Sequence, residues 1–191
     1  MRTLRPALIL LAAFTLLCGV LYPLAVTGAA TLVWPHQARG SVVDAGGHAV
    51  GSALIGQTFT NPGYLWGRPS AVAYDARTSM GSNLGPRDPR LVEALRERAV
   101  ALARTASGRA VPIELITASA SGLDPHVSPA AARYQIERVA AARKVPPATV
   151  AAIIEAAVEP PTLGFLGAAR VNVLVVNLAL DRKLGPPPAV Q

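Results

Sequence analysis

The sequence predicts one transmembrane helix near the N-terminus, followed by a single extracytoplasmic α+β domain. Residues 7–34 form an uncharged apolar segment. After it, short β-branched runs between Gly and Pro alternate with segments whose apolar residues recur at helical spacing. We therefore expect a cytoplasmic N-terminus over 1–6, a transmembrane helix over 7–34, an extracytoplasmic α+β domain over 35–185 and a flexible tail over 186–191.

The apolar segment from Ala7 to Trp34 contains no Asp, Glu, Lys, Arg or His. A helix that crosses the ~30 Å core of a bilayer needs about 20 apolar residues. The segment is therefore long enough for one crossing with some tilt. Pro23 lies inside it and lacks a backbone N–H, so a buried neighbouring helix or a local adjustment would satisfy the carbonyl left without a partner, and we expect a kink there.

Charges near the segment predict its orientation. Arg2 and Arg5 precede it, whereas His36 and Arg39 are the only basic residues close behind it. Because positive charge favours the cytoplasmic side, we expect the N-terminus inside and the domain outside. A cleaved signal peptide is the alternative, since residues 27–30 are small. The length of the apolar segment favours a retained anchor.

The composition excludes several classes of protein. The chain has 18 basic and 11 acidic side chains, and the two signs are interspersed along it. Aromatic residues make up 5% of the chain, so nucleic acid binding through a basic, aromatic-rich surface is not expected. Cys18 is the only cysteine and lies in the apolar segment. The domain therefore has neither a disulfide framework nor a thiolate metal site.

Local signals place the elements of the domain. Three helices are expected where a capping residue or a proline precedes apolar residues at helical spacing, and they begin at 88–89, 128–129 and 146–147. The second is expected to continue to Lys144. Strands are expected at 41–43, 53–55, 71–74, 111–118 and 170–180, the last one central and running into a short helical end.

No catalytic motif stands out. The glycines near residue 81 lack the following Lys of a phosphate-binding loop, and neither Ser119 nor Ser121 has glycine two places before it, as a nucleophile elbow requires. Asp124 and His126 could share a metal or a proton, although this pattern is more typical of a loop that leads into a helix. An independent membrane-anchored hydrolase or binding protein that uses Asp124, His126 and the nearby serines is the alternative function.

Several sequence blocks follow one another along the domain. They are Gly56-Gln57-Thr58-Phe59 with Pro62 and Tyr64, Arg68-Pro69-Ser70-Ala71, Gly81-Ser82-Asn83-Leu84-Gly85-Pro86, the run from Thr117 to His126, Arg170-Val171-Asn172-Val173-Leu174, and Asn177-Leu178-Ala179-Leu180-Asp181. Together with the anchor they resemble the C-subunit family of Kdp potassium-transporting ATPases. Met80 and Ala169 depart from the family pattern, which has glycine and proline there.

The resemblance implies an accessory, non-catalytic subunit of an ATP-driven, high-affinity potassium uptake complex in the bacterial plasma membrane. Its implied partners are a channel-like potassium-binding subunit, a P-type ATPase subunit and a very small accessory subunit. The helix would pack against the channel-like subunit and the domain would lie over that subunit's outer face. Within the helix, Gly19, Ala25, Gly28 and Ala29 could let another helix approach closely.

The resemblance also implies a chaperone-like increase in the ATPase subunit's affinity for ATP. No firmly bound cofactor is expected in this chain, and ATP would act through the complex. Ser119, Ser121, Gly122 and Gln135 are the candidate residues for a nucleotide effect. Because the charge rule places them outside the cytoplasm, where ATP is, we expect the effect to be transmitted rather than to come from direct contact.

Overall fold

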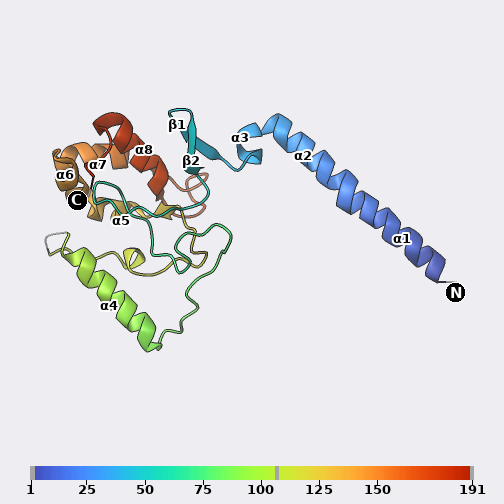
Figure 1. Ribbon diagram of the computed structural model, residues 1–191, viewed down its shortest axis with the longest axis horizontal. Helices are drawn as coiled ribbons and strands as arrows, with labels where there is room; N and C mark the ends of the chain where they lie inside the picture. The colour runs from blue at the N-terminus through green and yellow to red at the C-terminus, as the bar shows by residue number, and fades with distance from the viewer. Residues whose placement is uncertain (1–2, 106–107, 190–191) are drawn as a thin grey trace. The chain divides into compact units, whose positions relative to one another are not determined.

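The computed structural model describes residues 3–105 and 108–189 (Figure 1). Arg2, which contributed to the expected orientation, and the last two residues of the expected tail lie outside these ranges. The chain divides into two compact units, Met1–Val42 and Val43–Gln191, and each has its own internal organisation.

The first unit is a long apolar helix. It consists of α1 (Leu4–Leu16), a π-helical turn (Leu17–Leu21), α2 (Tyr22–Val33) and the short α3 (Pro35–Ala38). Within Leu4–Val33 an 18-residue stretch has a mean hydropathy of 2.4, and the side chains of that stretch are all exposed. The expected membrane-spanning helix is therefore present as an apolar helix of sufficient length.

The helix has a local adjustment next to Pro23, one of the two alternatives expected there, while the kink stays a prediction. Pro23 stands in the first turn of α2, directly after the π-helical turn Leu17–Leu21. Proline cannot donate a hydrogen bond to the preceding turn, and its ring crowds the carbonyl four residues before it. A wider turn at this point relieves that crowding while the helix continues.

The second unit confirms the α+β class. One sheet pairs β1 (Val42–Ala45) with β2 (His48–Ser52), and the other has the order β3–β5–β4 with antiparallel neighbours. In the second sheet, Val171 of β5 lies between Val127 and Val158. The remaining elements are α4 (Pro89–Ala103), a 3-10 turn (Ile113–Leu115), β3 (His126–Val127), α5 (Pro129–Tyr134), α6 (Ile136–Arg143), α7 (Pro147–Glu155), β4 (Val158–Glu159), β5 (Arg170–Asn172) and α8 (Val173–Leu184).

The three expected helix starts are confirmed. The Asp88 carboxylate accepts a hydrogen bond from the Arg90 N–H, and the Ser128 hydroxyl accepts one from the Ala131 N–H, so both residues cap their helices. Pro147 opens α7 without a side-chain cap. The second helix is not continuous, because it breaks at Gln135 into α5 and α6.

Two of the expected strands, 53–55 and 71–74, are turns. An isolated bridge between Ser52 and Ile55 closes the first one. In the second, the Ser70 hydroxyl accepts hydrogen bonds from the N–H groups of Val72 and Tyr74. A serine that satisfies two successive turn donors favours a turn over an extended strand, although the residues themselves are strand formers.

The expected strand 111–118 is wrong, and the one expected over 170–180 is confirmed as central and as running into a helix, but it is much shorter than expected. The first holds only the 3-10 turn Ile113–Leu115, which begins directly after Pro112. The second is a central strand for just three residues, because the Asn172 side chain accepts a hydrogen bond from the Val175 N–H and starts α8 there. The apolar residues after Asn172 therefore pack as one face of a helix.

The hydrophobic core gathers the inner faces of α5, α6, α7 and α8 around the three-stranded sheet. Fully buried members are Leu65, Val127, Val139, Val150, Ile154, Val171, Val176 and Leu180. Leu65 differs from the other core members because it lies in the irregular segment 61–69 and not in a helix or strand.

Two amide side chains hold that segment on the helices. Asn177 of α8 accepts a hydrogen bond from the Leu65 N–H at 2.7 Å and donates one to the Leu65 carbonyl at 3.0 Å. Gln135 does the same for the next residue: it accepts from the Trp66 N–H at 2.9 Å and donates to the Trp66 carbonyl at 3.1 Å. Each amide thus replaces the partner that a neighbouring strand would supply.

Two buried arginines also attach the segment 61–69 to the helices. Arg138 donates to the carbonyls of Pro62 and Tyr64, and its guanidinium lies 3.5 Å from the centre of the Trp66 ring. Burial lowers the pKa of Arg138 to about 9. Arg143 donates to the Gly63 carbonyl and forms a 2.7 Å ion pair with Asp181. These contacts fix the segment in position without any regular secondary structure.

We predict that Asn177→Ala lowers the free energy of unfolding by about 2–4 kcal/mol, because both backbone groups of buried Leu65 lose their partner. Urea unfolding of the full chain in detergent, followed by tryptophan fluorescence, measures this. The control is Arg77→Ala, which removes an exposed ion pair with Asp75 and should leave the midpoint unchanged. Equal midpoints for Asn177→Ala and the wild type would contradict the prediction.

Candidate functional site

Three of the residues proposed for a nucleotide effect lie in one loop, and each is engaged within the chain. The Ser119 N–H donates to the Pro69 carbonyl at 3.0 Å. The Ser121 carbonyl accepts from the Met80 N–H at 2.9 Å, and its hydroxyl accepts from the Leu123 N–H. Gln135 lies at the break between α5 and α6, where its amide pairs with Trp66.

Gly122 has a structural reason to be glycine. Its φ is +68°, and a Cβ there would lie 2.7 Å from the Met80 carbonyl oxygen and 2.6 Å from a methyl of Val72. Its own carbonyl accepts a hydrogen bond from the Ser70 hydroxyl at 2.7 Å. A side chain at this position would therefore separate two loops that pack closely. The nucleotide role of these four residues stays a prediction.

The structure brings Asp124 and His126 together at the start of β3. The Asp124 carboxylate accepts hydrogen bonds from Arg68 at 3.2 Å and from the His126 N–H at 3.0 Å. The His126 ring nitrogen Nδ1 lies 3.9 Å from the same carboxylate. Burial and, after it, the charge of Arg170 hold the pKa of His126 below its ordinary value. The ring is therefore kept neutral near pH 7.

The neighbouring Ser128 is not arranged as a nucleophile. Its hydroxyl donates to the Glu114 carboxylate and accepts from the Ala131 N–H at the start of α5. Over residues 3–105 and 108–189, no group of three or more His, Cys, Asp and Glu side chains is placed to hold a metal ion. This geometry matches the interpretation of residues 124–128 as a loop that leads into a helix.

The four small residues of the anchor are all exposed along the apolar helix. Ala25, Gly28 and Ala29 are spaced three and four residues apart, so they lie on one face of α2. An added Cβ at Gly28 would meet no atom within 4 Å. Gly19 belongs to the π-helical turn. The face around Gly28 would let a second helix approach the backbone closely.

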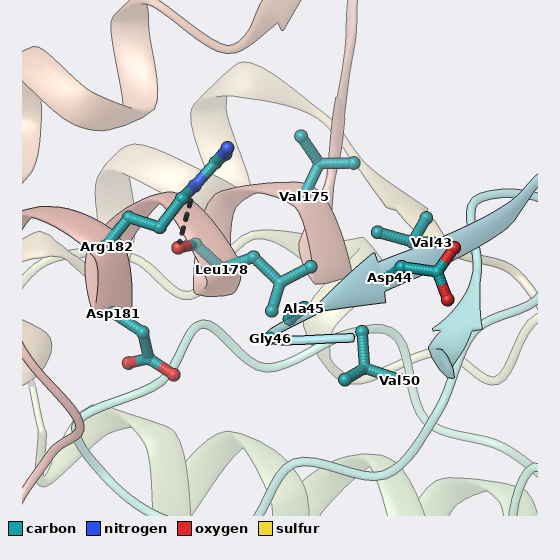
Figure 2. Close-up of a pocket in the computed structure, with 9 residues that line it drawn as sticks. All are labelled: Val43, Asp44, Ala45, Gly46, Val50, Val175, Leu178, Asp181 and Arg182. Atoms are coloured by element: carbon teal, nitrogen blue, oxygen red, sulfur yellow. Dashed lines mark hydrogen bonds between the residues drawn. The ribbon is translucent and has the colours of Figure 1, made fainter. Parts of the chain in front are cut away.

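The domain also has an apolar groove that sequence reasoning missed. Figure 2 shows Val43 and Val50 from the β1–β2 hairpin around one hollow with Val175 and Leu178 from α8. Its volume is about 560 Å³, and Asp44, Asp181 and Arg182 supply its polar lining. The two walls come from opposite ends of the domain sequence, so no local pattern indicated the groove.

Comparison with known proteins gives a consistent family match. The model of the family described as KdpC, K+-transporting ATPase, c chain, matches residues 4–182. A potassium-transporting ATPase KdpC subunit of Polaromonas naphthalenivorans is 56% identical over 183 residues, covering 93% of each chain. The subunits of the same name from Caulobacter vibrioides and Gemmatimonas aurantiaca are 53% and 50% identical, and the latter alignment covers 100% of this chain and 98% of the relative.

Proposed function

This chain belongs to the KdpC family of K+-transporting ATPases, and on that premise we propose that it stabilises the assembly of a potassium uptake complex through its apolar helix and its domain. As a KdpC it is a non-catalytic subunit of the Kdp ATPase complex, so the resemblance in the sequence is confirmed. The alternative of an independent hydrolase built on Asp124 and His126 does not fit a non-catalytic subunit.

The observation that carries the proposal is the anchor. An apolar helix of 30 residues runs over Leu4–Val33, and its described side chains are exposed throughout its most apolar stretch. Lipid can cover such a helix, but lipid alone gives no reason for small residues to share one face at Ala25, Gly28 and Ala29. A partner helix that approaches closely does give a reason for this arrangement. The anchor is then a binding surface as well as a tether.

The proposed partners are the channel-like potassium-binding subunit, the P-type ATPase subunit and the very small accessory subunit. We further propose a cytoplasmic N-terminus and an extracytoplasmic domain, in the bacterial plasma membrane. Arg5 at the start of the helix supports this orientation through the preference of positive charge for the cytoplasmic side. The domain would then lie over the outer face of the channel-like subunit.

We also propose that any increase in the ATPase subunit's affinity for ATP is transmitted through the complex. Gln135 and Ser121 are tied to backbone groups of their own chain. A nucleotide that bound them directly would have to break these contacts, and the proposed orientation keeps them away from cytoplasmic ATP.

The orientation predicts one-sided labelling. With Cys18→Ala, a new cysteine from Val92→Cys on the exposed side of α4 becomes the only thiol, because Val92 is 57% exposed. A membrane-impermeant maleimide should label it in right-side-out vesicles and not in sealed inside-out vesicles. The reverse pattern would place the domain in the cytoplasm.

The anchor face predicts a loss of assembly without a loss of insertion. Gly28→Leu combined with Ala29→Leu should reduce copurification of the channel-like subunit from native membranes by about tenfold, because bulky side chains keep the partner helix away. Resistance to carbonate extraction should be unchanged. Ala12→Leu with Ala13→Leu adds two leucines at neighbouring small residues of α1 and serves as the control. Unchanged copurification of the Gly28 and Ala29 variant would sink the proposed role of this face.

If the effect on ATP affinity is transmitted through the complex, the purified full chain should not bind ATP by itself. Isothermal titration calorimetry at millimolar ATP should show no saturable heat for the wild type or for Ser121→Ala. The reconstituted complex, by contrast, should bind ATP more tightly with this chain than without it. Saturable binding to the isolated chain that Gln135→Ala abolishes, with its fold verified by fluorescence, would establish direct contact instead.

A further inference from the structure

Two basic side chains face one carboxylate at the start of β3. The Arg68 Nη1 lies 3.2 Å from Oδ2 of Asp124, and the His126 Nδ1 lies 3.9 Å from Oδ1 of the same carboxylate. The second distance is too long for a hydrogen bond, so the neutral ring lies beside the ion pair without joining it. The side chains of Arg68, Asp124 and His126 are 27%, 28% and 26% exposed, so water and protons reach all of them.

Arg68 is held loosely for a half-buried arginine. Its Nη2 donates to the Ala118 carbonyl at 3.4 Å, and its Nε is buried without a hydrogen-bond partner among the described residues. By contrast, Arg143 donates to the Gly63 carbonyl at 2.6 Å and to Asp181 at 2.7 Å. Charge-assisted hydrogen bonds are ordinarily about 2.7–2.9 Å long. Release of Arg68 to water therefore breaks two long contacts and hydrates a donor that lacks a partner.

The surroundings of His126 decide when its ring takes up a proton. Burial and, after it, the charge of Arg170 lower the pKa of the ring, whereas Glu159 and Asp124 raise it. The net shift is downward from the ordinary pKa of 6.5, so the proton arrives only on acidification. The charged side chains around the ring are Asp124 in the preceding loop, Arg170 of β5, Glu159 of β4, Glu114 of the 3-10 turn, which accepts hydrogen bonds at the start of α5, and Arg68 beyond Asp124.

Proton uptake changes the balance of charge around Asp124. Three positive charges, on the ring, Arg68 and Arg170, then lie near the carboxylates of Asp124 and Glu159. Glu159 already pairs with Arg170 at 2.9 Å, which leaves Asp124 for the ring. Both ring nitrogens of a charged histidine are donors, and a small movement brings Nδ1 within hydrogen-bond distance of Oδ1. Because the charges on the ring and on Arg68 repel each other, the loosely held Arg68 leaves.

We propose that the Asp124 carboxylate passes from Arg68 to the His126 ring when that ring takes up a proton, and that the exchange releases the Arg68 guanidinium to water. The exchange is a pH-sensitive switch on the surface of the domain. Backbone contacts such as the hydrogen bond from the Ser119 N–H to the Pro69 carbonyl do not titrate, so the switch alters side chains and surface charge but not the fold. The inference rests on the proposed function in one respect, because the extracytoplasmic orientation makes the external medium the source of the proton.

Titration of the ring is the first test. The chain has three histidines, and His36→Gln with His48→Gln leaves His126 as the only one. Both replaced side chains are exposed, so the domain should keep its fold. NMR of the isotope-labelled full chain in detergent should show a ring that titrates below the ordinary value of about 6.5. Adding Arg170→Gln should move the titration to higher pH, because a positive charge near the ring is lost. A ring that stays neutral throughout the acid range would overturn the proposal.

Hydrogen exchange of the Arg68 Nε–H reports the release directly. At about pH 7.5 its exchange with water should be equal in the wild type and in His126→Gln, because a neutral ring leaves Arg68 on Asp124. Below the measured midpoint of the ring it should be several-fold faster in the wild type, because Arg68 has moved into water. Comparing the two chains at one pH removes the intrinsic pH dependence of exchange. The control is the Arg138 Nε–H, which is also buried without a partner in the described part of the chain and should exchange alike in both.

The outcomes separate this inference from the proposed function. Equal Arg68 exchange rates in the wild type and in His126→Gln on acidification would overturn the inference. If His126→Gln does not fold, Arg170→Gln takes its place, since it keeps the ring and should move the onset of faster Arg68 exchange to higher pH; an unmoved onset would overturn the inference. These measurements use the purified chain, so their failure leaves the proposed function standing. A domain that maleimide labels only in inside-out vesicles would overturn the proposed orientation, and with it the external source of the proton.

Discussion

The pairing of amide side chains with one stretch of backbone organises the domain. The segment 61–69 crosses the inner faces of α6 and α8 with its backbone N–H and C=O groups buried, and these groups need partners. Asn177 and Gln135 each satisfy both groups of one residue, and Arg138 and Arg143 cover the carbonyls before them. This buried polar network favours one arrangement of the segment, because every backbone group named above has a partner in it, although the Arg138 Nε is buried without one among the described residues. Leu65 enters the core because of it.

The same constraint explains where sequence reasoning succeeded and failed. Helix starts were predicted correctly because the cap is local: Asp88 and Ser128 each bond an N–H two or three residues ahead. Strands were predicted poorly because β-branched composition does not reveal what pairs with the backbone. Asn172 shows this well, since one side-chain hydrogen bond converts most of an expected strand into α8. Gln135, at the break between α5 and α6, pairs with Trp66, which is far away in sequence, so no local pattern could reveal this contact.

The candidate surfaces also differ in whether the sequence could reveal them. The small residues of the anchor could be read from the sequence, because spacing on a helix fixes which of them share a face. The apolar groove could not be read in this way. Val50 and Leu178 come together only in the fold.

A non-catalytic subunit acts through the shape it presents, so the rigidity of the domain has a functional meaning. The three-stranded sheet pairs β5 with β3, and the first residue of α8 donates to the Pro125 carbonyl beside it. α8 in turn carries Asn177, which holds Leu65. The sheet is thereby joined through α8 to the polar network at the centre of the domain. A contact made on the sheet would act on a closely packed, hydrogen-bonded framework, and such a framework resists local yielding.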